Sequence, residues 1–586
     1  MSELISQKMR KIAPELDPLR IGTGWTKNDL SKPQIIIEST FGDSHPGSGH
    51  LNGIVEEVRR GIYDAGGYGA RYYCTDICDG ESQGTDGINY SLASREMIAN
   101  MIEIHANATP FDGGVYVASC DKGMPAHLMA MARNDIPSVV VPGGVMSAGP
   151  GLLTLEQLGA YSARCERGEI LPEELEWAKE NACPGCGACS FIGTASTMQI
   201  MAEALGLALP GSALLPAESD TILEYAYNAG KRVVELALQG GCPSHLVTLK
   251  SFENAVMVHA AISGSTNCML HLPAIAHEYG IDIDGETFDR LHRNVPYILN
   301  LRPAGKWPAE FFRYAGGVPA VMEEIKNLLH LDVMTITGKT LGENLEELNN
   351  NGYYDKCMEE LEVANKKYGI SLVKEDIILP SANPLGINGS ITVLKGNLAP
   401  DGAVIKHTAC PKEMYTAVLS ARPFDSEEEC INAVLKHRVK KGDAVFIRYE
   451  GPRGSGMPEM FYTSEAISTD KELGKSIALI TDGRFSGAST GPVIGHVSPE
   501  AQCGGPIALV EEEDLIEIDI PNRKLNIVGV KGERKTPEEI ENILKERRLK
   551  CIPVPIKYKR GVLRLFAEHA QSPMKGAYLD FDAKNQ

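Results

Sequence analysis

The feature that most constrains the fold is a regular alternation of short apolar runs with amphipathic stretches early in the chain. Residues 33–39 (PQIIIES) predict a buried strand, and residues 51–65 predict the helix after it. Residues 114–119 (GVYVAS), 126–133 and 137–142 (PSVVVP) repeat the order strand, helix, strand. Strands that alternate with helices in this way predict a parallel sheet covered by helices on both faces.

The pattern changes further along the chain. Residues 194–209 predict a buried helix, and residues 332–367 are charged and helical in character. Beyond residue 370, short predicted strands are separated by glycine and proline: GSITVLKG, GAVIKH, DAVFIRYEGP, SIALITDG, PIALV, LIEIDI and KLNIVGV. Many short strands with frequent turns predict a barrel or sandwich. We therefore expect an α/β protein with an N-terminal doubly wound parallel-sheet domain (1–370) and a C-terminal β-barrel-like domain (371–586).

Length and charge narrow the class of protein. A chain of 586 residues is too long for one core, which agrees with two domains. The formal net charge of -20 argues against non-specific nucleic-acid binding, which needs a basic surface. No segment gives the roughly 18 uninterrupted apolar residues of a membrane span, and the first residues lack a signal-peptide core. We expect a cytoplasmic protein with no nucleic-acid or membrane partner.

Two sequence motifs bring metal-binding residue types together. Fourteen cysteines are too few and too irregularly spaced for a disulfide scaffold. Cys120, Asp121 and Lys122 follow a predicted strand in SCDKGMPA, the position at which parallel sheets place ligands. Cysteines in a C-x2-C-x2-C spacing occur later in CPGCGACSFIGTASTM, at Cys183, Cys186 and Cys189. Thiolates favour iron–sulfur centres and carboxylates favour magnesium, but the cysteine spacing alone leaves zinc or no metal open.

Several long blocks resemble the dihydroxy-acid and phosphogluconate dehydratases, enzymes that remove water from 2,3-dihydroxy carboxylic acids. The resemblance covers nearly the whole chain. Its blocks are CDGESQGTDG, SCDKGMPA, GACSFIGTASTM, SGSTNCMLHLPAIAHE, KGNLAPDGAVIKHTA, RYEGPRGSGMPEM and TDGRFSGASTGPVIGHVSPEA. The segments HLDVMTITGKTLGENLE and FSGASTG are most similar to the branch that acts on sugar acids such as xylonate.

The resemblance implies roles for individual residues. It implies that Cys120 and Cys189 bind an iron–sulfur cluster, either [2Fe-2S] or [4Fe-4S]. It also implies a Mg2+ site with four oxygen ligands: Asp79, Asp121, Glu459 and a carbamylated Lys122. Ser486 would be the general base. A serine needs a nearby cation to act as an alkoxide.

One departure from the family pattern affects the cluster. Gly47 stands where many branched-chain acid dehydratases have a cysteine, which removes a third cluster ligand. Cys78 is the candidate replacement, because phosphogluconate-type members also have CDG at this point, and Cys186 is a weaker candidate. His50 is a candidate substrate contact.

Simpler interpretations exist for three of these residues. Asp79-Gly80 is typical of a turn. Lys122 could pair with Asp121 or bind a substrate carboxylate as an ordinary cation. The glycine-rich loop 483–491 around Ser486 could hold phosphate through its amides, although it lacks the ending of a nucleotide-binding loop.

We predict an iron–sulfur and Mg2+-dependent dehydratase that converts a sugar acid, an aldonate such as D-xylonate, to a 2-keto-3-deoxy acid. The alternative within the family is a dihydroxy-acid dehydratase of branched-chain amino acid biosynthesis. Two other classes are a zinc protein that uses Cys183, Cys186 and Cys189, and a thiol oxidoreductase that uses the Cys183–Cys186 pair. The resemblance also implies a homodimer or homotetramer.

Overall fold

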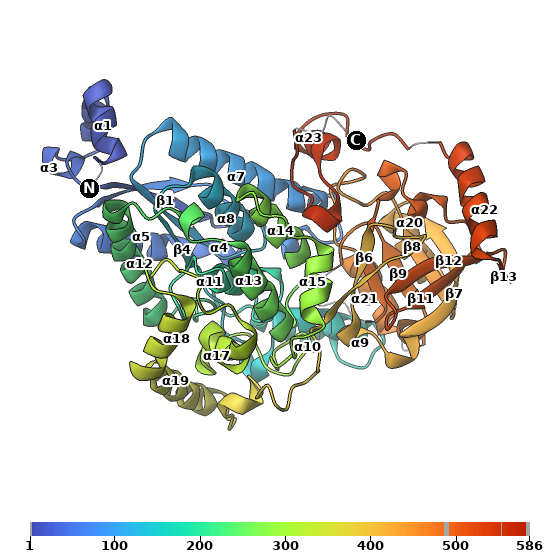
Figure 1. Cartoon of the computed structure of the whole chain (residues 1–586). Helices are drawn as coiled ribbons and strands as arrows, with labels where there is room; N and C mark the ends of the chain where they lie inside the picture. Colours follow the sequence, from blue (N-terminus) through green and yellow to red (C-terminus); the bar gives the residue numbers. More distant parts are fainter. Residues whose placement is uncertain (1–2, 471, 486–490, 553, 582–586) are drawn as a thin grey trace.

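The computed structural model describes residues 3–470, 472–485, 491–552 and 554–581, which fold around two sheets that lie side by side (Figure 1). The first sheet has four parallel strands in the order β2-β1-β3-β4. Their bounds are Gln34–Ser39 (β1), Tyr68–Tyr73 (β2), Gly113–Ala118 (β3) and Ser138–Pro142 (β4). Because β1, β3 and β4 are buried along their whole length, their sequences are almost continuously apolar.

Helices cover both faces of the first sheet (Figure 1), which confirms the predicted doubly wound arrangement. Helices α5 (Leu51–Asp64) and α12 (Asp220–Gln239) pack on one face, and α7 (Tyr90–Ala108) and α8 (Gly123–Asn134) lie on the other. Glycines allow α5 and α12 to cross closely. A Cβ at Gly61 would collide with the Tyr227 carbonyl, and a Cβ at Gly230 would collide with the Val58 carbonyl.

A layer of further helices completes the first half of the chain. It contains α11 (Thr194–Ala204), α13 (Leu249–Ala261), α14 (Cys268–Glu278), α17 (Gly317–Glu324), α18 (Leu341–Asn350) and α19 (Tyr353–Tyr368). The predicted helix 194–209 is real but ends at Ala204. Gly206 takes a positive φ of 78° just beyond it, a conformation that ends a helix and suits glycine.

The second sheet has nine strands in the order β13-β12-β11-β7-β8-β9-β10-β6-β5. Their bounds are Ile391–Leu394 (β5), Gly402–Lys406 (β6), Thr416–Phe424 (β7), Asp443–Ile447 (β8), Ala478–Thr481 (β9), Val493–Ser498 (β10), Leu515–Asp519 (β11), Lys524–Val530 (β12) and Glu533–Arg534 (β13). Lys395, at the end of β5, donates to the Arg523 carbonyl (2.9 Å) and accepts from the Leu525 amide (3.0 Å). These bonds join β5 to β12 and close the sheet into a barrel, as predicted.

The strand predictions for the barrel contain one error and several omissions. PIALV, predicted as a strand, is a 3₁₀-helix over Pro506–Leu509, because Pro506 fixes the first turn after Gly504 and Gly505. Strands β7, β10 and β13 of the barrel were not predicted, and neither was β2 of the first sheet. β7 is only partly buried and mixes polar with apolar residues, and β10 contains a bulge between Gly495 and Ser498.

The two halves meet along helices from both sides. Helix α15 (Gly285–His292) packs on β5, and α9 (Leu158–Glu166) contacts α21 (Phe461–Thr469). In the residues that the structure describes, we find no helix with the length and apolar character of a membrane span.

Candidate active site

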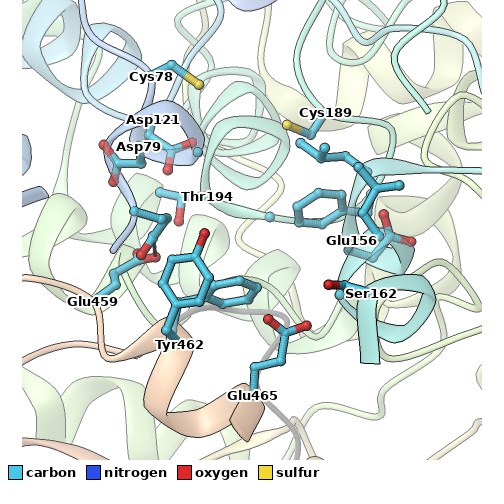
Figure 2. Close-up of a pocket in the computed structure, with 18 of the residues that line it drawn as sticks. Cys78, Asp79, Asp121, Glu156, Ser162, Cys189, Thr194, Glu459, Tyr462 and Glu465 are labelled. Atoms are coloured by element: carbon cyan, nitrogen blue, oxygen red, sulfur yellow. Dashed lines mark hydrogen bonds between the residues drawn. The ribbon is translucent and has the colours of Figure 1, made fainter. Parts of the chain in front are cut away.

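A cavity of about 580 Å³ lies between the two halves of the chain. Six of the residues singled out from the sequence line it: Cys78, Asp79, Cys120, Asp121, Cys189 and Glu459. Figure 2 shows Asp79, Asp121 and Glu459 grouped on one side of this cavity, with Cys78 above them and Cys189 on the opposite side.

Local structure explains why residues distant in sequence meet here. Cys120 and Asp121 follow strand β3, and Lys122 precedes helix α8, so all three lie at the carboxyl end of a parallel strand. Asp79 is the first residue of α6 (Asp79–Ser82). Glu459 comes from the C-terminal half, where it forms an isolated bridge with Arg484.

Two buried cations lie among the three carboxylates. Lys122 Nζ lies 2.8 Å from Asp79 Oδ2 and 3.9 Å from Asp121 Oδ2. Arg484 Nη1 lies 3.2 Å from Glu459 Oε1 and 3.7 Å from Asp79 Oδ2. The side chains of Lys122 and Arg484 are fully buried. The acids and bases therefore compensate each other inside the protein, where an unpaired charge would be costly.

The cations act unequally on the pKa values of the acids. Burial alone would raise the pKa of Asp79, but Lys122 and Arg484 outweigh burial and hold this pKa below its usual range. Burial raises the pKa of Asp121 to about 7, an effect that Lys122 opposes and the carboxylate of Asp79 reinforces. Asp79 is therefore an ionised oxygen donor at neutral pH, whereas Asp121 needs a further positive charge to become fully ionised.

Polar side chains that the sequence analysis missed orient these acids. Ser91 Oγ donates to Asp79, with both carboxylate oxygens 2.7 Å away. Asn267 Nδ2 donates to Glu459 Oε1 (2.7 Å) and to Thr194 Oγ1 (2.8 Å), and Gln83 Nε2 donates to Glu459 Oε2 (3.1 Å). Asn267 lies in SGSTN and Thr194 in GTAST, so the motifs contained the signal, but their partner Glu459 lies far away in the sequence.

The cysteines form a second group of donors. The sulfur atoms of Cys78 and Cys189 point toward one another across the cavity (Figure 2). Burial raises the pKa of Cys78 to about 11 and those of Cys120 and Cys189 well above the usual thiol value, so without a metal these groups remain thiols. Gly47 leaves room beside Cys120, because a Cβ there would lie only 2.8 Å from Cys120 Sγ.

The donor chemistry fits the two inorganic groups that the resemblance implies. Within the described ranges, no three His, Cys, Asp or Glu side chains are close enough together to enclose a metal ion as they stand. The residue types nevertheless match: hard carboxylate oxygens suit Mg2+, and three thiols around one end of the cavity suit an iron–sulfur cluster. A metal would also ionise the thiols, since coordination lowers their pKa.

Four of the predicted residues are absent from the cavity lining or lie outside the described residues. Lys122 is absent from the lining, although its side chain contacts Asp79, which lines the cavity. His50 is absent from the lining too, and His50 Nε2 instead lies 2.6 Å from the Gly143 carbonyl oxygen. Cys186 also lies outside the lining, near Gly49. Ser486 lies outside the described residues, two positions after Arg484.

The rest of the cavity wall combines apolar and polar groups. Leucine, isoleucine and phenylalanine side chains supply much of it: Leu155, Leu158, Leu175, Phe191, Ile431, Leu435 and Phe461. Glu156, Ser162, Tyr462 and Glu465 add hydrogen-bonding groups to this wall (Figure 2). The cavity can therefore hold a substrate with an apolar tail or one with several hydroxyls.

Comparison with known proteins identifies the class of this site and then the family. Residues 32–344 match the model of the dihydroxy-acid/6-phosphogluconate dehydratase N-terminal domain, and residues 376–577 match that of the C-terminal domain. The protein is therefore an enzyme of the hydro-lyase class. It belongs to the dihydroxy-acid/6-phosphogluconate dehydratase family.

Curated relatives match over almost their whole length. Dihydroxy-acid dehydratase 1 of Methanosarcina acetivorans is 42% identical over 566 residues, covering 95% of this chain and 96% of the relative. The dihydroxy-acid dehydratase of Methanosarcina barkeri is 41% identical and covers 97% and 99%. That of Caldanaerobacter subterraneus is 43% identical and covers 94% and 95%. These names favour the dihydroxy-acid dehydratase alternative over the sugar-acid prediction.

Proposed function

We propose that this protein dehydrates a branched-chain 2,3-dihydroxy acid, such as 2,3-dihydroxyisovalerate, to the 2-keto acid. The observation that carries the proposal is the single cavity in which the carboxylates of Asp79, Asp121 and Glu459 lie beside three thiols. The apolar side chains of the cavity wall suit a branched alkyl group. The relatives are named dihydroxy-acid dehydratases, which supports a dihydroxy acid as the substrate.

The inorganic groups are part of the proposal. Enzymes of this family generally use an iron–sulfur cluster and Mg2+. Here Cys120, Cys189 and Cys78 would hold the cluster. Mg2+ would be held by four side chains, those of Asp79, Asp121, Glu459 and a carbamylated Lys122. When bound, these groups supply Lewis acids for the C3 hydroxyl and for the carboxylate and C2 hydroxyl of the substrate.

The protein side chains then move the proton and shape the cavity. Ser486 would remove the proton from C2 while the C3–oxygen bond breaks, and this proton would then pass to the departing hydroxide, so that water is released. The resulting enol takes up a proton at C3 and becomes the 2-keto acid. Ser486 follows Arg484, whose guanidinium is a candidate for the cation that a serine base requires.

A sugar acid such as D-xylonate is the second candidate substrate. Its support is the polar part of the wall, since Glu156, Ser162 and Tyr462 could hydrogen-bond to the hydroxyls of an aldonate. A site that hydrogen-bonds a hydroxyl rejects an analogue that lacks it more strongly than an apolar site rejects an added methylene. The two candidates therefore predict clearly different selectivities.

The deciding experiment is a substrate panel on anaerobically purified protein. The panel contains 2,3-dihydroxyisovalerate, D-xylonate and D-gluconate, each with and without Mg2+, and keto-acid formation is measured. We expect a brown protein that turns over 2,3-dihydroxyisovalerate fastest and only with Mg2+. Turnover of the aldonates alone would select the second candidate, and turnover of none would reject both.

Two further assignments belong to the same proposal. We assign the cluster and most of the Mg2+ ligands to an N-terminal part, residues 1–370, and the base to a C-terminal part, residues 371–586. We also propose a homodimer or a homotetramer, which light scattering on the purified enzyme would test.

A further inference from the structure

Two buried histidines lie behind the cavity wall without lining it. His259 belongs to α13, and His292 is the last residue of α15. His259 Nδ1 lies 3.1 Å from His292 Nε2, and both side chains are almost fully buried. They therefore interact with each other rather than with solvent or substrate.

The partners of this pair fix where its protons lie. His259 Nε2 lies 2.9 Å from the Ser265 carbonyl oxygen, which can only accept, so Nε2 carries a hydrogen. The Ile391 amide of β5 can only donate, and it donates to His292 Nδ1 (3.3 Å). His292 Nε2 must then donate to His259 Nδ1. The hydrogen bonds run in one direction from the barrel, through both rings, to Ser265.

This chain of hydrogen bonds is complete only when both rings are neutral. A second proton on His259 would face the hydrogen on His292, and a second proton on His292 would face the Ile391 amide. Burial lowers the pKa of His259 to about 4 and holds that of His292 well below its usual value. Both rings are therefore neutral at the pH of ordinary assays.

The Ser265 end of this series of hydrogen bonds reaches the three carboxylates of the site. Ser265 Oγ lies 2.9 Å from Thr194 Oγ1 and accepts a hydrogen bond from the backbone amide of Asn267 (3.3 Å). Asn267 Nδ2 donates to Glu459 Oε1 at 2.7 Å. One turn, residues 263–267, thus connects the histidine pair to Glu459.

Close packing shows that the backbone accommodates these rings specifically. A Cβ at Gly264 would collide with the His259 ring, and a Cβ at Gly389 would lie 2.5 Å from His292 Nδ1. The barrel contacts the same turn a second time, since Lys406 Nζ donates to the Ser263 carbonyl at 2.9 Å.

We propose that His259 is a positioning residue for Glu459. By holding the Ser265 carbonyl, it fixes the turn from which Asn267 orients the Glu459 carboxylate. The role rests on the proposed function, because that function assigns Glu459 to Mg2+. The positioning role predicts that loss of the hydrogen bond from His259 to the Ser265 carbonyl weakens divalent-ion binding, although no residue that touches the ion is removed.

The test compares His259→Leu with His259→Gln in iron-loaded holoenzyme. Leucine leaves the Ser265 carbonyl without its donor, whereas the glutamine amide can still donate to it. Two quantities are measured: the Mn2+ dissociation constant, by electron paramagnetic resonance, and the Mg2+ concentration that gives half-maximal turnover. We expect His259→Leu to raise each of them by about tenfold or more. His259→Gln should restore both to within about twofold of the wild-type values, well inside that tenfold change.

Phe288→Leu is the matched control, because the Phe288 ring packs edge-on against His259 with centroids 5.6 Å apart. It loosens the same helices but removes no hydrogen bond, so both constants should stay unchanged. If His259→Leu does not fold, His259→Asn takes its place, since its amide is too short to reach Ser265. A folded Leu or Asn variant with wild-type constants, or equal shifts in Phe288→Leu, would overturn the role.

The proposed function and the positioning role can fail separately. If the wild-type enzyme dehydrates no acid in the panel but binds Mn2+, the function is rejected, and the Mn2+ comparison still decides the role of His259. If the enzyme is active and Mg2+-dependent but indifferent to His259→Leu, only the positioning role is rejected.

Discussion

Lys122 Nζ lies 2.8 Å from Asp79 Oδ2. This buried ion pair connects the start of α8 to the start of α6. The same nitrogen is 3.9 Å from Asp121 Oδ2. As an ammonium, Lys122 competes with a metal ion for these oxygens. As a carbamate, it would become a third anionic oxygen donor beside them.

Lys122→Gln should therefore lower turnover by about 100-fold or more, because it removes a proposed metal ligand. Wild-type enzyme depleted of carbon dioxide should lose activity and regain it when bicarbonate is added. Lys179→Gln is the control, since Lys179 lines the cavity but pairs with Glu176 at the surface and not with the proposed metal ligands. Wild-type activity that ignores bicarbonate would remove the carbamate from the proposal.

Arg484→Met should destabilise the folded enzyme strongly. The fully buried guanidinium lies between Asp79 and Glu459, and its removal leaves two buried carboxylates without a shared cation. Breaking a buried pair in this way costs about 3–5 kcal/mol. The measurement is the free energy of unfolding from chemical denaturation. Arg564→Met, which breaks a surface pair with Glu568, should cost less than about 1 kcal/mol, and equal losses in both variants would count against the bridging role.

Ser486→Ala should abolish most turnover while the metal content stays intact. Loss of a general base typically costs about 10²–10⁴-fold in rate. Iron, sulfide and visible absorption should match the wild type, since the hydroxyl is not a proposed metal ligand. Activity within tenfold of the wild type would show that another group removes the C2 proton.

Cys78→Ser should release much of the iron and weaken the visible absorption. Cys78 lines the cavity together with Cys120 and Cys189, whereas nearby Cys74 does not, so Cys74→Ser is the matched control. The comparison is iron and acid-labile sulfide per chain after anaerobic purification. An unchanged spectrum in Cys78→Ser would leave the third ligand to another residue.

The sequence predicted the parts of the fold that depend on local pattern. Buried parallel strands such as β1 and β3 contain uninterrupted apolar runs, III and VYVA, and these runs identified them in the sequence. Strand β10 was missed because its pairing depends on Gly495, where a Cβ would lie 2.5 Å from Phe485 Cδ1. That contact exists only after the barrel has formed.

The same limit applies to the site. Motifs with unusual residue types, such as Cys120-Asp121-Lys122, could be recognised along the chain. Arg484 and Asn267 could not, because each acts through Glu459 or Asp79, residues that only the folded structure brings near. His259 carried even less signal, since the hydrogen bonds that fix its ring end on two backbone groups. These are the Ser265 carbonyl and, by way of the His292 ring, the Ile391 amide.

Stability should fall as the pH rises from about 6 to about 8, in part because of Glu500. This carboxyl group is buried and accepts hydrogen bonds from the Arg453 and Gly454 amides. Burial raises its pKa from 4.5 to about 8, and Asp482 adds to the effect. Between these two values the folded protein keeps a proton that the unfolded chain has lost, so each pH unit removes up to about 1.4 kcal/mol of stability.

The glutamine side chain in Glu500→Gln cannot ionise. The free energy of unfolding of this variant should therefore fall less steeply with pH than that of the wild type between pH 6 and pH 8, and the difference in slope should be up to about 1.4 kcal/mol per pH unit. A residual slope should remain, because burial also raises the pKa of Glu450 to about 8. The check is chemical denaturation at pH 6, 7 and 8, with Glu533→Gln, an exposed residue paired with Lys535, as the control. Parallel pH curves for Glu500→Gln and the wild type would mean that Glu500 is already ionised in the folded enzyme at pH 6.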